Sequence, residues 1–165
     1  MKASACFLLF ALICLQTAAQ PGKYAGSMKK LLNKTFTDDR KIPGLTGWKF
    51  QEGSLLTNVN DPEVMTANVF KKGTTLIVIF SDKEDTSSAE YIIVDVLEVK
   101  NVLSSQTIRT GTCSEGPNEA VDIVALIKKE KKDTSKAIKA WRLNRDKKRI
   151  ELVSAKLVKC MNEVD

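Results

Sequence analysis

The chain has 165 residues, a formal net charge of +6 and no histidine. Without histidine, the Ser-His-Asp and Cys-His catalytic arrangements are excluded, as are zinc sites built on imidazole. Removing a predicted leader of nineteen residues leaves 146, enough for one domain with a hydrophobic core.

The first nineteen residues predict a secretory signal peptide. Lys2 supplies a positive start, residues 5–15 form an apolar run, and Thr17 and Ala19 are the small residues that a signal peptidase recognises. The run of roughly 11 residues is shorter than the ~20 needed to cross a bilayer. We therefore predict cleavage after Ala19, a single globular domain over residues 20–165, and a secreted or periplasmic protein without an integral membrane segment. An uncleaved anchor and a lipoprotein modified at Cys14 are the alternatives.

Cys113 and Cys160 predict a disulfide. Cys6 and Cys14 leave with the signal peptide, so an even pair remains in an oxidising compartment. A crosslink over this span contributes about 4 kcal/mol in the chain-entropy treatment. A reactive or metal-binding thiol is the competing interpretation, and the absence of histidine weakens it. Neither a metal nor a cofactor is expected.

The first half of the chain predicts a short helix at residues 24–33 and then strands from Trp48 onward. β-rich runs at residues 64–70 and 74–81 flank Gly73, a pattern typical of a hairpin. Residues 76–80 are apolar at every position and favour a central strand. A polar loop is expected at residues 82–88, followed by a β-branched strand at residues 91–99.

The second half predicts a strand at residues 106–113, a turn-rich loop at 113–118 and an amphipathic strand at 121–128. Asp133-Thr134-Ser135 is typical of the cap of one helical turn reaching Ala140. Strands on either side of residues 145–148 then form a second hairpin. Its inward residues are expected to be Trp141, Leu143, Ile150 and Leu152.

These elements predict the α+β, mainly β, class. We expect a single antiparallel sheet of roughly five to seven strands with one or two short helices.

Charge is strongly segregated along the chain. Residues 128–149 contain eleven lysines and arginines but three acids, a local excess of +8. Such strings bind phosphate backbones, anionic lipids or acidic polysaccharides, and an adjacent tryptophan can stack on a base or sugar. The residues of this predicted anion site are Lys128, Lys129, Lys131, Lys132, Trp141, Arg142, Arg145, Lys147, Lys148 and Arg149. Two alternatives stay open: the charges protect a sheet edge from association, and the tryptophan is a core residue.

Asp95 is the candidate catalytic residue. In the predicted strand 91–99, alternation places Ile93, Asp95 and Leu97 on one face, so the carboxyl group has apolar neighbours. Burial raises the pKa of a carboxyl group and suits it to general-acid catalysis. The alternatives are a face turned to water and a pairing of Asp95 with Arg109.

The sequence favours an exported soluble binding or interaction module that uses a β-sheet surface and a basic C-terminal hairpin. Its expected partner is an acidic protein or a polyanion. One alternative is an extracytoplasmic hydrolase or lyase that uses carboxylate and lysine chemistry without histidine, and a pocket with two acids within reach of each other favours it. The other alternative is an envelope structural component.

Overall fold

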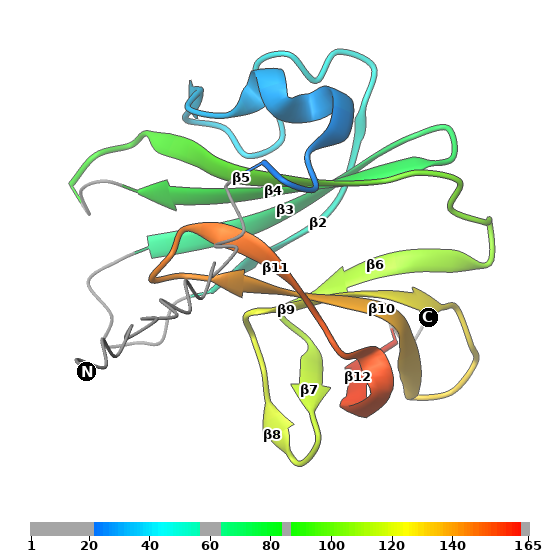
Figure 1. The fold of residues 1–165 in the computed structure, drawn as a ribbon. Coiled ribbons are helices and arrows are strands. Elements are labelled where there is room, and N and C mark those ends of the chain that lie inside the picture. The colour runs from blue at the N-terminus through cyan, green and yellow to red at the C-terminus, as the bar shows by residue number, and fades with distance from the viewer. Residues whose placement is uncertain (1–21, 57–63, 84–86, 163–165) are drawn as a thin grey trace, which may run out of the picture.

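The computed structural model describes residues 22–56, 64–83 and 87–162, so the predicted signal peptide at residues 1–19 lies outside the described residues. The described residues form two antiparallel sheets that lie one above the other (Figure 1). The antiparallel, mainly β character is confirmed, whereas the prediction of a single sheet is wrong.

The first sheet has five strands in the order β1-β5-β4-β3-β2. These strands are β1 (Thr35–Phe36), β2 (Lys49–Leu55), β3 (Val64–Lys72), β4 (Thr75–Lys83) and β5 (Tyr91–Val99). β3 and β4 form the predicted hairpin, and Gly73 in its turn has a φ of 58°, which glycine adopts without strain. Asp82 belongs to β4, where a loop was predicted.

The second sheet has seven strands in the order β6-β9-β10-β12-β7-β8, and β11 also pairs with β10. The strands are β6 (Gln106–Thr110), β7 (Cys113–Glu115), β8 (Asn118–Glu119), β9 (Ile123–Lys128), β10 (Thr134–Asn144), β11 (Arg149–Val153) and β12 (Val158–Met161). β10 and β11 flank residues 145–148 and confirm the predicted C-terminal hairpin. Leu152 was expected to face inward with Ile150, but 59% of it is exposed.

Helical structure among the described residues is limited to two 3-10 helices, η1 (Gly26–Leu31) and η2 (Ala155–Leu157). The first lies within the helix predicted at residues 24–33. The helical turn predicted at Asp133–Ala140 is wrong, because β10 covers most of this segment. Ala137 and Ala140 pair with Ile127 and Ala125 of β9, and this long-range pairing outweighs the local capping signal.

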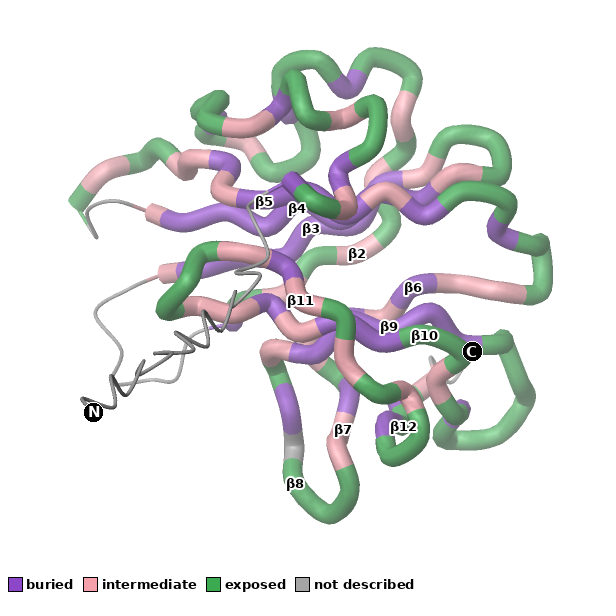
Figure 2. Tube along the Cα trace, in the orientation of Figure 1, coloured by how far each residue is buried: buried purple, intermediate pink, exposed green. Residues whose placement is uncertain are grey.

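The two-layer arrangement follows from strands that are apolar on both faces. In β4, Val78 and Phe80 contribute to the core between the sheets, while Ile77 and Ile79 point to the outer face of the first sheet. The segment that precedes β2 covers that outer face with a second core (Figure 2). The prediction of a central buried strand at residues 76–80 is confirmed, since all five residues are at most 2% exposed.

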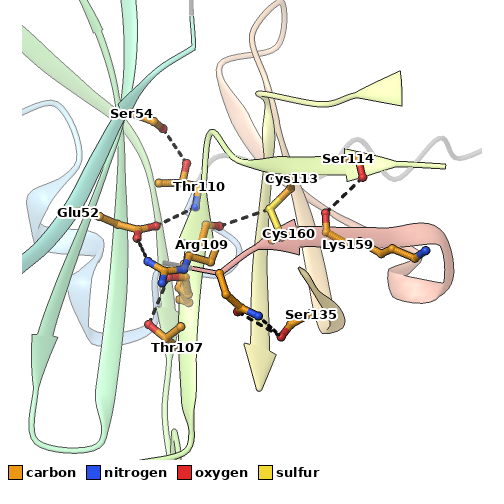
Figure 3. Close-up of a disulfide and its surroundings, with 12 residues drawn as sticks. Glu52, Ser54, Thr107, Arg109, Thr110, Cys113, Ser114, Ser135, Lys159 and Cys160 are labelled. Carbon is orange, nitrogen blue, oxygen red and sulfur yellow. Dashed lines mark hydrogen bonds and ion pairs between the residues drawn. A yellow bond between two sulfur atoms is a disulfide. The ribbon is translucent and has the colours of Figure 1, made fainter. Parts of the chain in front are cut away.

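Side chains join the two sheets where β2 lies beside β6 (Figure 3). The Glu52 carboxylate accepts a hydrogen bond from the Thr110 backbone N–H at 2.8 Å and from Arg109 Nη1 at 2.7 Å. The hydroxyl groups of Ser54 and Thr110 are 2.8 Å apart. Arg109 is thus paired with Glu52, and the predicted pairing with Asp95 is wrong.

The Cys113–Cys160 disulfide is confirmed and links β7 to β12. The two residues are directly opposite each other in the antiparallel ladder, and their Cα atoms are 3.9 Å apart, closer than the usual 4.4–6.8 Å. The disulfide lies in a third buried cluster, on the outer face of the second sheet. None of the helices in the described segments has the length and apolar character of a membrane span.

Candidate functional site

A cleft of about 560 Å³ lies on the outer face of the first sheet, beside the segment that precedes β2. Residues from β1, β2, β3 and β5 form its floor and walls, and the turn after β1 forms its rim. The lining residues are Phe36, Thr37, Asp38, Asp39, Arg40, Phe50, Gly53, Ser54, Leu55, Thr66, Asn68 and Tyr91.

The alternation of β3 places polar groups on the floor of this cleft. Met65, Ala67 and Val69 point into the core between the sheets, so Thr66 and Asn68 point to the opposite, outer face. The Thr66 hydroxyl is 3.0 Å from the hydroxyl of Ser81 on β4 and is therefore hydrogen-bonded.

Asn68 is the unusual residue of the floor. It is only 2% exposed, and its amide nitrogen Nδ2 is buried without a hydrogen-bond partner among the described residues. A buried polar group without a partner costs about 1–3 kcal/mol of stability. Native structures contain few such groups, and each calls for an explanation such as a functional role.

Gly53 gives the Asn68 side chain its space. The two residues are direct partners in the β2–β3 ladder, after a register shift between Phe50 and Glu52. A Cβ atom at Gly53 would lie 2.5 Å from Oδ1 of Asn68 and 3.3 Å from the Phe50 ring. The glycine therefore keeps the floor open because no side chain competes with the amide.

Aromatic rings form the walls. Phe36 on β1 and Tyr91 on β5 are stacked with ring centroids 5.5 Å apart, and Phe50 meets Phe70 edge to face at 5.6 Å. The guanidinium of Arg40 lies 5.7 Å from the centre of the Phe50 ring, within the range of a cation–π contact. The cleft thus combines apolar ring surfaces with a polar floor.

Two acids, Asp38 and Asp39, lie on the rim of the cleft, and the environment of Asp38 does not suit proton donation. The carboxylate of Asp38 accepts a hydrogen bond from the Arg40 backbone N–H at 2.9 Å and lies 3.5 Å from Lys41 Nζ. The backbone hydrogen bond is the main reason that the pKa of Asp38 is lowered from its ordinary value of 3.8. Asp39, its neighbour in sequence, is exposed.

Asp95 lies between the two sheets and connects β5 of the first sheet to β11 of the second by hydrogen bonds. Its carboxylate accepts backbone hydrogen bonds from Gly22 at 2.6 Å, Val96 at 2.8 Å and Ile150 at 2.7 Å, and the residue is 1% exposed. Burial raises its pKa above the ordinary 3.8, as expected from the sequence, and the three N–H donors oppose this rise.

The neighbours expected for Asp95 are partly wrong. A register shift between Phe80 and Ser81 of β4 leaves Val94 as an extra residue in β5. As a result, Ile93 belongs to the core on the outer face of the first sheet. Leu97 belongs to the core between the two sheets, and Asp95 points to this same side.

The hairpin half of the predicted anion site is paired with acids. Arg142 contacts Glu115 and Asp122, and Lys148 contacts the buried carboxylate of Asp82. Lys147 and Arg149 both contact Glu151, at 3.3 and 2.7 Å.

Trp141 is a core residue, 4% exposed, so its indole is not available to stack on a base or sugar. Arg145 is half-buried in the turn.

The other half of the predicted anion site lies at the opposite end of β10. Lys128, Lys129, Lys131 and Lys132 are exposed at the end of β9 and in the loop that follows. β10 has 11 residues, which span roughly 35 Å as a strand, so the two halves do not form one continuous surface along it.

The cleft was not predicted from the sequence. The available signal was the pair Thr66 and Asn68, two polar residues inside an otherwise apolar strand.

Within the described residues, no group of three or more acids and cysteines is placed to hold a metal ion. Comparison of the chain with known protein families, characterised proteins and solved structures finds no match.

Proposed function

We propose that the chain is an exported binding protein that holds a small, flat molecule bearing an amide or carbonyl group in the outer-face cleft. The buried amide of Asn68, which has no hydrogen-bond partner among the described residues, is the observation that carries this proposal. The volume of about 560 Å³ falls within the range of small-molecule sites, roughly 300–1,000 Å³.

The lining defines the ligand class. Phe36, Tyr91 and Phe50 offer ring surfaces, which favour an aromatic or otherwise flat body. The side-chain amide of Asn68 contains both a donor and an acceptor, so it complements a ligand amide or carbonyl at the inner end of the cleft. The gain is large because the pairing satisfies a buried polar group that has no partner among the described residues.

Binding is favoured over hydrolysis. Acid–base catalysis by two carboxylates requires that their pKa values be moved apart, one of them upward. The pKa of the rim acid Asp38 is shifted downward. The acid with a raised pKa, Asp95, already accepts three backbone hydrogen bonds between the sheets.

Two observations support export. The N-terminal segment has the layout of a signal peptide, and the Cys113–Cys160 disulfide is typical of proteins that fold in an oxidising compartment.

The experiment is a screen of ring compounds that carry an amide or carbonyl group, with calorimetry to measure the Kd of the best one. Asn68→Leu keeps the branched shape and the number of side-chain heavy atoms but cannot hydrogen-bond, so it should weaken binding about tenfold or more, the effect of one lost hydrogen bond to a buried group. The matched control is Asn118→Leu, because Asn118 is exposed on β8 of the other sheet. Equal affinity of Asn68→Leu and wild type would contradict the proposal.

A further inference from the structure

Three strands of the second sheet bring lysines side by side. Lys136 of β10 and Lys159 of β12 are directly opposite each other in the antiparallel ladder. On the other side of β10, Ala137 pairs with Ile127, so Lys136 and Lys128 are the next residues along that ladder. All three lysines are exposed, and we name them the lysine row.

No acid among the described residues neutralises the lysine row. None of its three ammonium groups contacts a carboxylate among residues 22–56, 64–83 and 87–162. Like charges that are directly opposite in a sheet destabilise it. Opposite Cα atoms in an antiparallel ladder are about 4.5–5.5 Å apart, so the row is a dense line of positive charge that runs across the strands.

Further lysines flank the row. The loop after β9 carries Lys129 and Lys131, both exposed, and Lys132, which lies 3.8 Å from Glu130. Asn162 holds this loop against the end of β12: its backbone N–H donates to the Asp133 carbonyl at 2.8 Å, and its side-chain amide donates to the Lys132 carbonyl.

The surroundings of Lys159 are rigid. The neighbouring Cys160 is bonded to Cys113 on β7, and the hydroxyl of Ser114 on the same strand lies within 3.5 Å of the Lys159 carbonyl. Figure 3 shows the Lys159 side chain extending away from the disulfide.

We propose that the lysine row binds a linear sulfated polysaccharide. A line of fixed ammonium groups complements the repeated sulfate and carboxylate charges of such a chain. This partner differs from the small ligand of the cleft, and its site uses different residues on the other sheet.

A sulfated polysaccharide fits better than a nucleic acid for two reasons. Single-stranded nucleic acids are held largely by stacking of bases on aromatic side chains, and the one aromatic residue of the basic segment, Trp141, is buried. The disulfide also indicates a compartment outside the cytosol, where polysaccharides are the abundant polyanions.

The test measures heparin binding by calorimetry over a series of salt concentrations. The variant is K128Q/K136Q/K159Q, and the matched control is K49Q/K71Q/K72Q. Lys49 and Lys71 are also directly opposite each other, on β2 and β3, so the control removes the same charge and a similar juxtaposition.

We expect the lysine-row variant to bind heparin roughly tenfold more weakly, or weaker still, near physiological salt. The slope of the logarithm of the binding constant against the logarithm of the salt concentration should fall in magnitude by about 2–3, the value for three charges that each contribute as they do on DNA. Its Tm should be unchanged or higher, since a repulsion is removed. Asn68→Leu should bind heparin like wild type, which separates this result from the fate of the cleft.

Three results would overturn the proposal: no measurable heparin binding by the wild type, an equal loss in the control variant, or tighter binding of single-stranded DNA than of heparin at the same salt concentration.

Discussion

Replacing Asn68 with leucine should stabilise the protein while it removes ligand binding. Most single substitutions destabilise a protein, by about 1 kcal/mol on average. Asn68 differs because its Nδ2 is buried without a partner among the described residues, and its side chain is 2% exposed. Leucine has the same branching and the same number of side-chain heavy atoms, and it places no polar atom at this buried position.

The expected gain is about 1–3 kcal/mol, the cost of leaving a buried polar group unsatisfied. For a domain of this size, that range raises the Tm by roughly 3–10 °C. Urea denaturation followed by tryptophan fluorescence should show a higher midpoint with an unchanged m-value, because the area exposed on unfolding is the same.

Thr66→Val is the matched control. It lines the same cleft, but it breaks a satisfied pair and leaves the hydroxyl of Ser81, which is 0% exposed, without its partner. It should therefore lower the free energy of unfolding by about 1–3 kcal/mol. If Asn68→Leu lowers stability as Thr66→Val does, Asn68 is satisfied in the free protein and the reasoning about the cleft is wrong.

Three further predictions concern the supports of the fold and the cleft. Asp95→Asn should lower the free energy of unfolding measured by urea denaturation by about 2–4 kcal/mol. The reason is that the NH₂ group of the introduced amide faces at least one of the three backbone N–H donors. Because the pKa of Asp95 is raised from 3.8, the folded state holds the proton more tightly than the unfolded chain does. The contribution of Asp95 to the free energy of unfolding should therefore be largest below pH 3.8 and fall as the pH rises through the raised pKa. A series of urea denaturations in which this contribution grows with pH would show the reverse shift. Replacing both Cys113 and Cys160 with alanine should lower the free energy of unfolding by about 4 kcal/mol, and a loss below 1 kcal/mol would mean that the crosslink constrains the unfolded chain little. Gly53→Ala should cost about 1–3 kcal/mol in the wild type but much less beside Asn68→Ala, since its Cβ would meet the amide at 2.5 Å, and additive costs in this double-mutant cycle would contradict the contact.

Local patterns were sufficient to predict most strands. The apolar run at residues 76–80 and the β-branched run at residues 91–99 are strands in the structure, and Gly73 lies in the expected turn. The disulfide was predictable because only two cysteines follow the predicted leader.

The pairing of strand edges was not predictable. Alternation identifies which residues form a strand but carries no information about which strand lies next to which, so it does not distinguish one sheet from two. For the same reason, Asp133–Ala140 was assigned a helical turn: the capping residues are local, whereas the β9 partners of β10 are decided by the tertiary fold.

The residues of the cleft come together only through this pairing. Asn68 and Gly53 are opposite each other because β2 pairs with β3 after a register shift. No local sequence pattern predicts this shift. A similar irregularity at Val94 separates Ile93 from Asp95, where strict alternation would place them on one face.

The predicted anion site combined residues that the structure separates. The acids that pair with the hairpin are distant in sequence: Lys148 and Asp82 are 66 positions apart, and Arg142 and Glu115 are 27 apart. Conversely, Lys136 and Lys159 were not among the predicted site residues, although the sheet places them directly opposite each other.

The most direct test of the cleft is the side-chain amide signal of Asn68 in ¹H–¹⁵N spectra, assigned with the Asn68→Leu variant, during titration with the best ring compound from the screen. We expect a saturable downfield shift of an Nδ2 proton, with the Kd measured by calorimetry, because the ligand supplies an acceptor to a group that has none among the described residues. A compound that saturates the protein while this signal stays in place would show that the ligand binds elsewhere and that the buried amide is not the recognition group.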